Sequence, residues 1–80
     1  MDDREIVQRI SGLAEEEHRL ERAHEGTPLG DAELARLREI EVSLDQCWDL
    51  LRQRRARRAA GSDADEAAPR PPSTVEGYQQ

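Results

Sequence analysis

Apolar residues recur at helical spacing in two segments of the chain, and no segment alternates apolar and polar residues for long enough to indicate a strand. In the first segment the apolar residues lie four, three and seven positions apart: Ile6, Ile10, Leu13 and Leu20. The second carries a stripe over about five turns: Leu34, Leu37, Ile40, Leu44, Cys47, Trp48 and Leu51. The pattern predicts an all-α fold with helices at about residues 3–25 and 31–60.

Residues that start or stop helices flank both segments. Asp2 and Asp3 place carboxylates at the positive end of the first helix. Glycines and a proline interrupt the pattern between residues 26 and 30. We expect Asp31 to be the N-cap of the second helix and Gly61 to end it.

The short connection makes the two helices antiparallel neighbours. Full-length pairing brings residues face to face where their numbers sum to roughly 57. Apolar residues then meet at almost every level: Ile6 with Leu51, Ile10 with Cys47 and Trp48, Leu13 with Leu44, and Leu20 with Leu37. We therefore predict an antiparallel helical hairpin in which Trp48 is buried and Cys47 is a small core residue.

The apolar stripe of the second helix is wider than one neighbouring helix can cover. At 100° per residue it spans about 140° of arc. We expect the hairpin to form a homodimer with the architecture of a four-helix bundle. A self-associating interaction or adaptor module is the function that this architecture favours.

Residues 61–80 form a tail that contains prolines and few apolar side chains. Pro69, Pro71 and Pro72 favour an extended path, and Val75 and Tyr78 are its large apolar residues. The chain thus divides into a helical hairpin, residues 1–60, and a tail that is either flexible or docked on the hairpin.

Composition narrows the class of protein. The chain has 80 residues, of which 35% are hydrophobic and 38% are charged, so it holds one small domain at most. No apolar run is long enough to span a membrane, and the single cysteine excludes a disulfide scaffold. Without a signal-peptide pattern, a cytoplasmic location is expected.

A metal-binding bundle is the main alternative function. Glu17, Glu21 and His24 project from the apolar face of the first helix, and Glu21 with His24 has the Glu-x-x-His spacing of four-helix di-iron proteins. In the same register Glu33 faces His24, and Glu17 lies within reach of Arg36 or Arg38. The polar residues near the turn are also explained by contact with water, so no cofactor is assigned.

A nucleic-acid accessory role, through the run Arg52–Arg58, is a third and less favoured reading. Five arginines of residues 50–60 follow a segment, residues 1–49, that has fourteen acids and six arginines. The run's arginines spread around the helix, and no aromatic residue lies among them for base stacking. Arg52 to Arg55 are expected to lie against acids of the first helix, which leaves Arg57 and Arg58 free.

We expect binding and no enzymatic activity, because no nucleophile–base pair or phosphate-binding loop is visible. The predicted binding residues lie on the solvated edges of the second helix and in the tail: Asp45, Asp49, Arg57, Arg58 and Tyr78. The partner would be a second copy or another protein.

Several segments resemble a family of small actinobacterial proteins known only as a domain of unknown function. The resemblance rests on residues 44–58, with the central Leu-Asp-Gln-Cys-Trp-Asp-Leu-Leu, and on residues 16–20, 37–41 and 75–78. It spans nearly the whole chain and implies no activity, ligand or partner. It does imply that the tail belongs to the same unit as the hairpin.

Overall fold

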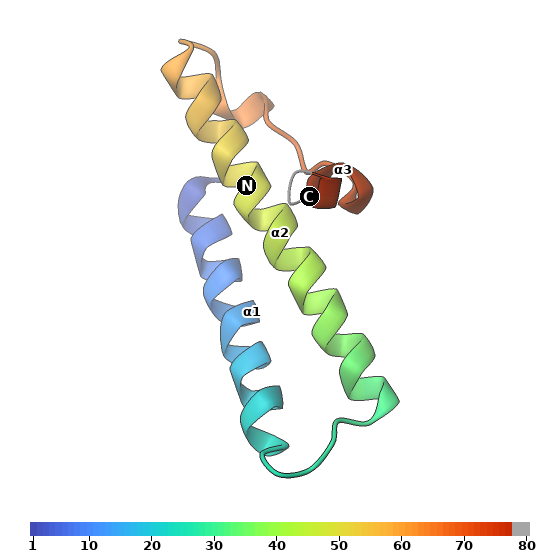
Figure 1. Cartoon of the computed structure of the whole chain (residues 1–80). Coiled ribbons are helices and arrows are strands. Elements are labelled where there is room, and N and C mark those ends of the chain that lie inside the picture. The colour runs from blue at the N-terminus through green and yellow to red at the C-terminus, as the bar shows by residue number, and fades with distance from the viewer. Residues whose placement is uncertain (78–80) are drawn as a thin grey trace.

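Two long helices lie side by side and antiparallel, and a tail with two short helical segments follows them (Figure 1). The structure is a computed structural model that describes residues 1–77, with the side chains of residues 1–75. Its elements are α1 (Asp3–Ala23), α2 (Asp31–Ala59), the 3₁₀ helix η1 (Ala64–Glu66) and α3 (Pro72–Gly77). The all-α prediction is confirmed, with both long helices close to their expected bounds. Among the described helices, none combines the length and the apolar composition that a membrane-spanning segment requires.

Local side chains fix where α1 and α2 begin. Asp2 is the N-cap of α1, and its Oδ1 accepts a hydrogen bond from the Glu5 amide at 2.8 Å. The expectation for α2 is wrong by one residue, because Gly30 is its N-cap and Asp31 its first residue. The carboxylate of Glu33 accepts from the Gly30 amide at 3.3 Å, and glycine has no side chain that could accept from the amides of the first turn.

Gly61 ends α2, as predicted. Its φ of 77° lies in the left-handed region that favours glycine. The chain reversal allows the Ser62 amide to donate to the Arg57 carbonyl at 2.7 Å and the Gly61 amide to donate to the Arg58 carbonyl at 3.1 Å. These two bonds form a Schellman motif, which turns the tail back along α2.

The predicted register is confirmed at both ends of the hairpin. Asp3 Oδ1 accepts from Arg54 Nε at 2.5 Å near one end, and His24 contacts Glu33 at the other. In both pairs the residue numbers sum to 57, as expected. Between them lies one core cluster, with Leu13 and Leu44 packed against it: Ile6, Ile10, Cys47, Leu50 and Leu51.

The two edges of the apolar stripe on α2 differ in their exposure to solvent. Leu50, which lies outside the predicted stripe, is buried at 5% exposure, whereas Trp48 is 46% exposed and the prediction that it is buried is wrong. The physical reason is the tail: Ala67 packs on the core, and Pro69 lies beside Leu50. Helix α1 covers the centre of the stripe and the tail covers the Leu50 edge, so the Trp48 edge is left exposed.

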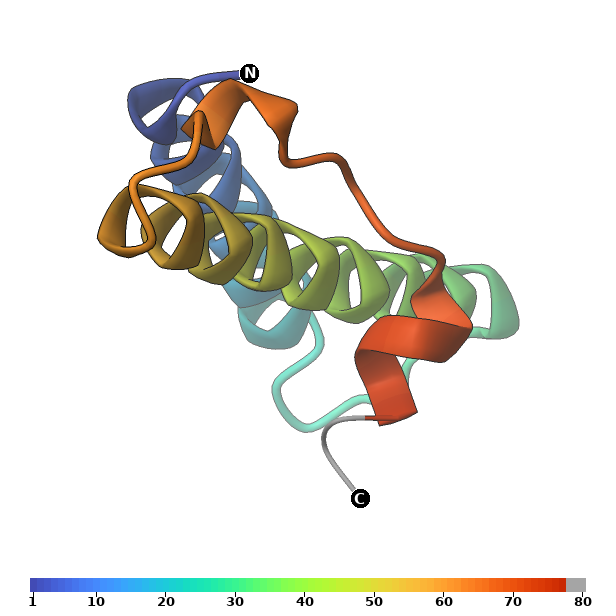
Figure 2. The ribbon, with the colours of Figure 1, turned by 90° about the horizontal axis from the view of Figure 1, so that it is seen from above.

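The tail runs back along α2, and both η1 and α3 contact that helix (Figure 2). Gln53 donates to the Ala68 carbonyl at 2.9 Å, and Gln46 donates to the Arg70 carbonyl at 3.2 Å. Val75 is 1% exposed. Residues 61–75 are therefore held by both polar and apolar contacts. Tyr78, the tail's other large apolar residue, lies outside the described residues.

Candidate interaction surface

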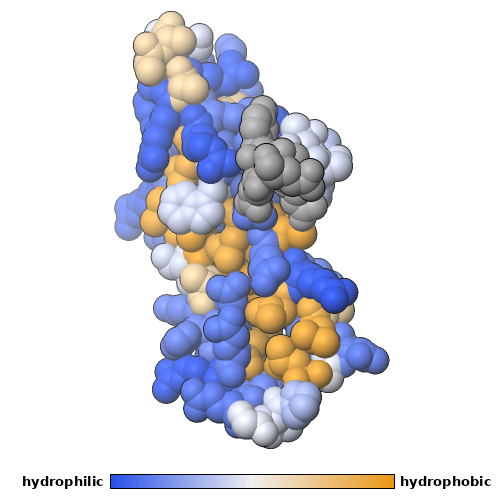
Figure 3. Space-filling view, in the orientation of Figure 1, coloured by the Kyte–Doolittle hydropathy of each residue, from blue (hydrophilic) through white to orange (hydrophobic). Residues whose placement is uncertain are grey.

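Large apolar side chains are exposed on the side of the hairpin that faces away from the tail. Val7 is 49% exposed, Trp48 46% and Leu34 38%. Hydrophobic side chains reach the surface along the seam between α1 and α2 (Figure 3). We call this surface the open face and define it by the exposed residues and two half-buried neighbours: Val7, Leu34, Leu37, Leu44 and Trp48.

Helical geometry places these residues on one side. On α2, Trp48 is about 160° around the helix axis from Gln46, which binds the tail, and about 40° from Leu34. On α1, Val7 is about 160° from Arg9, which lines a cavity next to the tail residue Pro69. Trp48, Leu34 and Val7 therefore point away from the tail on both helices.

Charged side chains border the open face along α2. Asp45 is half-buried, while Glu41, Arg52 and Arg55 are exposed. Arg52 approaches Asp49 only at 3.9 Å, and no ion pair joins Glu41, Asp45 or Arg55 to any other described residue. Asp45 is thus the predicted binding residue that the structure places beside Trp48, in solvent contact.

Asp49 differs from its prediction. We expected it on a solvated edge, but it is 0% exposed because the tail covers it. Arg70 donates to both carboxylate oxygens, with Nε 2.9 Å from Oδ2, and Gln53 Nε2 donates to Oδ2 at 3.0 Å. The hydrogen bonds from Arg70 lower the pKa of Asp49 despite the desolvation of its carboxyl group. Asp49 therefore anchors the tail within this chain.

Arg57 and Arg58 are not free, so that expectation is also wrong. Arg58 Nη2 lies 2.7 Å from Asp3 Oδ2, and Arg57 Nη1 lies 3.4 Å from Glu66 Oε2. The start of α1 reaches Arg58, and the reversal at Gly61 brings the acids of η1 back to α2.

Arg54 belongs to the same charged cluster and confirms that part of the run lies against α1. It is 7% exposed, and it binds Asp3 at 2.5 Å and Asp65 at 3.1 Å. Hydrogen bonds from Arg58 and Arg54 lower the pKa of Asp3 to about 2. Because intramolecular acids bind three arginines of the run, the nucleic-acid reading loses support.

The proposed metal ligands do not come together. His24 contacts Glu33, Glu17 is half-buried and Glu21 is exposed. Arg36 binds Glu16 through two hydrogen bonds of 2.6 and 2.7 Å, and not Glu17 as we expected. Within the part of the chain that the structure describes, no three His, Cys, Asp or Glu side chains gather closely enough to hold a metal ion.

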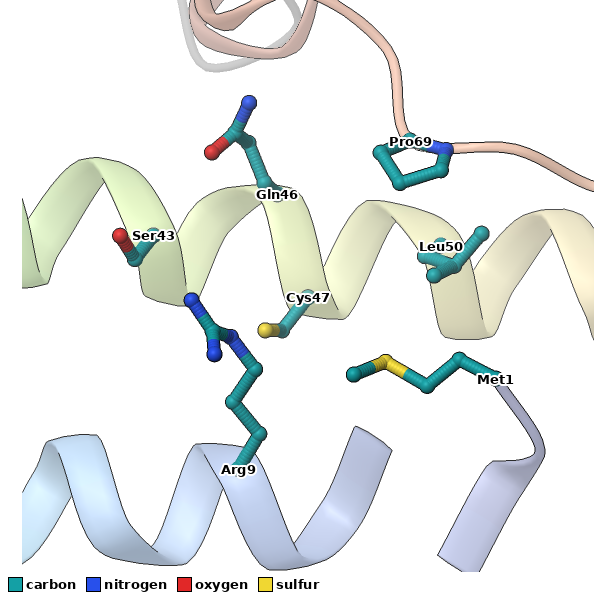
Figure 4. A pocket seen from close by; sticks show the side chains of 7 residues that line it. All are labelled: Met1, Arg9, Ser43, Gln46, Cys47, Leu50 and Pro69. Atoms are coloured by element: carbon teal, nitrogen blue, oxygen red, sulfur yellow. The ribbon is translucent and has the colours of Figure 1, made fainter. Parts of the chain in front are cut away.

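A cavity of about 280 Å³ lies between α1, α2 and the tail. Figure 4 shows the side chains that line it: Met1, Arg9, Ser43, Gln46, Cys47, Leu50 and Pro69. Cys47 is 7% exposed and belongs to the core, as predicted. Sequence reasoning missed this cavity because Pro69 completes it only when the tail folds back.

Comparison with known proteins identifies the family to which this chain belongs. Residues 2–80 match the model described as a protein of unknown function, DUF2630. The chain belongs to the DUF2630 family. The uncharacterized proteins Rv0898c of Mycobacterium tuberculosis and Mb0922c of Mycobacterium bovis are each 49% identical to it over 78 residues, covering 95% of this chain and 88% of theirs. No solved structure matches. The resemblance seen in the sequence is confirmed.

Three consecutive residues of this DUF2630 chain face three different surroundings. Cys47 points into the core, Trp48 lies on the open face and Asp49 binds the tail. Successive residues project about 100° apart around a helix, so one turn of α2 faces α1, solvent and the tail. This turn therefore carries both contacts within the chain and the exposed side chain of Trp48.

Proposed function

We propose that this DUF2630 protein is a self-associating protein–protein interaction module that acts by binding and not by catalysis. The observation that carries the proposal is the exposed apolar surface of the open face, above all the 46% exposure of Trp48. Contiguous exposed apolar surface in a soluble protein marks a site of association. Tryptophan is also the side chain that most often dominates binding energy at protein interfaces.

The dimensions of the molecule support the same proposal. Its Cα atoms extend over 50 × 25 × 16 Å, so the hairpin and its tail form a thin layer. The core cluster holds five buried residues. A small chain buries a low fraction of its apolar surface, and a partner seated on the open face adds burial that this fold lacks.

We propose the cytoplasm as the compartment. Cys47 is a free, buried thiol, which agrees with a reducing environment.

The single tryptophan provides a direct test of self-association. Sedimentation velocity and Trp48 fluorescence are measured between about 1 and 200 µM, where interfaces of modest affinity assemble. We expect the mass to double with concentration and the emission to shift to the blue as Trp48 leaves water. A protein that remains a monomer with unchanged emission over this range contradicts the proposal.

A matched pair of variants tests the surface itself. Trp48→Ser removes the largest side chain of the open face, and we expect dissociation of the dimer with helical circular dichroism retained. The control is Gln8→Ser, on the exposed outer side of α1. The open face is the wrong surface if Trp48→Ser associates as tightly as Gln8→Ser.

A further inference from the structure

The charges along the open face of α2 change sign at Trp48. Glu41 and Asp45 precede it, seven and three residues away, and Arg52 and Arg55 follow it, four and seven residues away. At 100° per residue all four lie within about 60° of Trp48 around the helix axis. One half of this surface is therefore acidic and the other half basic.

These charges are available to a partner. Glu41, Arg52 and Arg55 are exposed, and the Arg52 side chain keeps 60% of its surface in solvent. Glu41, Asp45 and Arg55 have no ion pair with the described part of the chain. The tail binds Gln46, Asp49 and Gln53, which lie about 100–160° from Trp48 around the helix. With the tail docked, Asp45 is half-buried and the other three charges are exposed.

We infer that the open face binds a second copy of this chain, with the two α2 helices antiparallel and the two-fold axis at Trp48. The inference rests on the proposed self-association and specifies its geometry. In a two-fold interface, the residue that meets a given partner residue is met by it in return. Positions equally far before and after the axis therefore face each other.

This arrangement pairs opposite charges twice. Glu41 and Arg55 are both seven residues from Trp48, so each Glu41 meets the Arg55 of the second copy. Asp45 lies three residues before Trp48 and Arg52 lies four residues after it, so Asp45 of each copy comes close to Arg52 of the other. Trp48 meets its own copy at the axis, and Leu44 lies beside it. Apolar burial supplies the affinity, and the charges fix the direction.

The alternatives fit less well. Two parallel α2 helices would set acid against acid and arginine against arginine, which disfavours that arrangement. A partner of uniform charge, such as a nucleic acid, would match the basic half and repel the acidic half. The sign change at the centre of the surface is self-complementary only in the antiparallel arrangement.

The test uses two charge reversals in the full chain, Glu41→Arg and Arg55→Glu. Each single variant places two like-charged pairs across its own homodimer, and we expect its dissociation constant to rise about tenfold or more at low salt. An equimolar mixture of the two variants makes both pairs attractive, so a heterodimer should form with affinity close to that of the wild type. The double variant in one chain should also recover. Native mass spectrometry and sedimentation measure both results.

Matched controls are Arg4→Glu and Glu15→Arg, which make the same charge changes at exposed positions on α1. Their mixture should show no preference for the heterodimer. If a reversal lowers the helical circular dichroism signal, Glu41→Gln and Arg55→Gln replace it, and each should weaken the dimer in a salt-dependent way.

The outcomes separate the geometry from the function. A wild-type dimer that is unaffected by either reversal, with no heterodimer preference, overturns the antiparallel arrangement and leaves self-association standing. A wild-type protein that is monomeric throughout overturns both the antiparallel arrangement and self-association.

Discussion

The contact between Asp49 and Arg70 holds the tail on α2, and Asp49→Asn tests its contribution. In the native chain Arg70 donates from Nε and Nη2 to the two carboxylate oxygens. Asparagine keeps the shape of the side chain but has one acceptor oxygen, and its amide group also donates. One N–H of Arg70 then faces another donor, and the charge attraction is lost.

The size of the effect follows from burial. A hydrogen bond to a charged group contributes about 1.5–3 kcal/mol to stability. The Arg70 side chain is 33% exposed, so a freed N–H can bind water, and the neutral amide costs less to bury than the carboxylate. We therefore expect Asp49→Asn to lower the free energy of unfolding by about 1–2 kcal/mol. Arg70→Gln leaves the buried carboxylate with Gln53 and should cost about 2–3 kcal/mol.

The assay is urea unfolding followed by circular dichroism at one fixed protein concentration. With an m-value of about 1 kcal/mol/M for a chain of this length, Asp49→Asn should lower the midpoint by about 1–2 M. Amide hydrogen exchange then locates the change. Exchange should accelerate in residues 61–75 and stay unchanged in the middle of α1.

A double-mutant cycle decides whether the two side chains act on each other. Asp49→Asn combined with Arg70→Gln should show a coupling energy of about 1–2 kcal/mol, beyond the value that independent sites give. If the effects of the two substitutions on the unfolding free energy are additive to within about 0.5 kcal/mol, the reasoning is refuted. It is also refuted if amide hydrogen exchange accelerates equally in α1 and in the tail.

Three further predictions concern the hairpin. The folded state holds the pKa of Asp3 at about 2, against 3.8 normally, so its ion pairs stabilise the fold above about pH 4 and are lost as the pH falls toward 2. Asp3→Asn should reduce this loss of stability in acid, which urea titrations at stepped pH measure. Gly12→Ala, in open space on α1, should raise the unfolding free energy by about 0.5–1 kcal/mol. Gly61→Ala, at φ 77°, should lower it by about 1 kcal/mol. Thermal melts in which both variants shift the melting temperature in the same direction would contradict this. Ile6→Ala, at a fully buried position, should cost about 2–4 kcal/mol in urea unfolding, against less than about 0.5 kcal/mol for the exposed Gln8→Ala.

The hairpin and its register could be predicted because they depend on spacing alone. A helical period fixes which side of each segment is apolar, and a short connection leaves the antiparallel arrangement as the solution. The pairing of Asp3 with Arg54 and the burial of Ile6 with Leu51 follow from that register. Family membership was also readable from the sequence, through the segment around Cys47 and Trp48.

The expectations for Trp48, Asp49 and Arg58 failed for different physical reasons. The stripe on α2 is too wide for α1, but its width does not say which edge a third element covers. The tail covers Leu50 and Asp49, and it leaves Trp48 exposed. Arg58 is expected to be free because it lies beyond the start of α1, yet its long side chain reaches Asp3 at 2.7 Å.

The sequence by itself determined two helices, their ends at Asp2 and Gly61, and the antiparallel register, because neighbouring residues and a short turn control each of these. The tertiary structure decided the path of residues 61–75, and with it the burial of Asp49, the ion pair of Arg57 and the exposure of Trp48. These features depend on polar and apolar contacts between α2 and the tail, which the reversal at Gly61 brings together. The spacing of apolar residues within a helix does not predict such contacts. The polar ones include those made by an arginine side chain and backbone carbonyl groups of the tail, and these groups have no periodic pattern in the sequence.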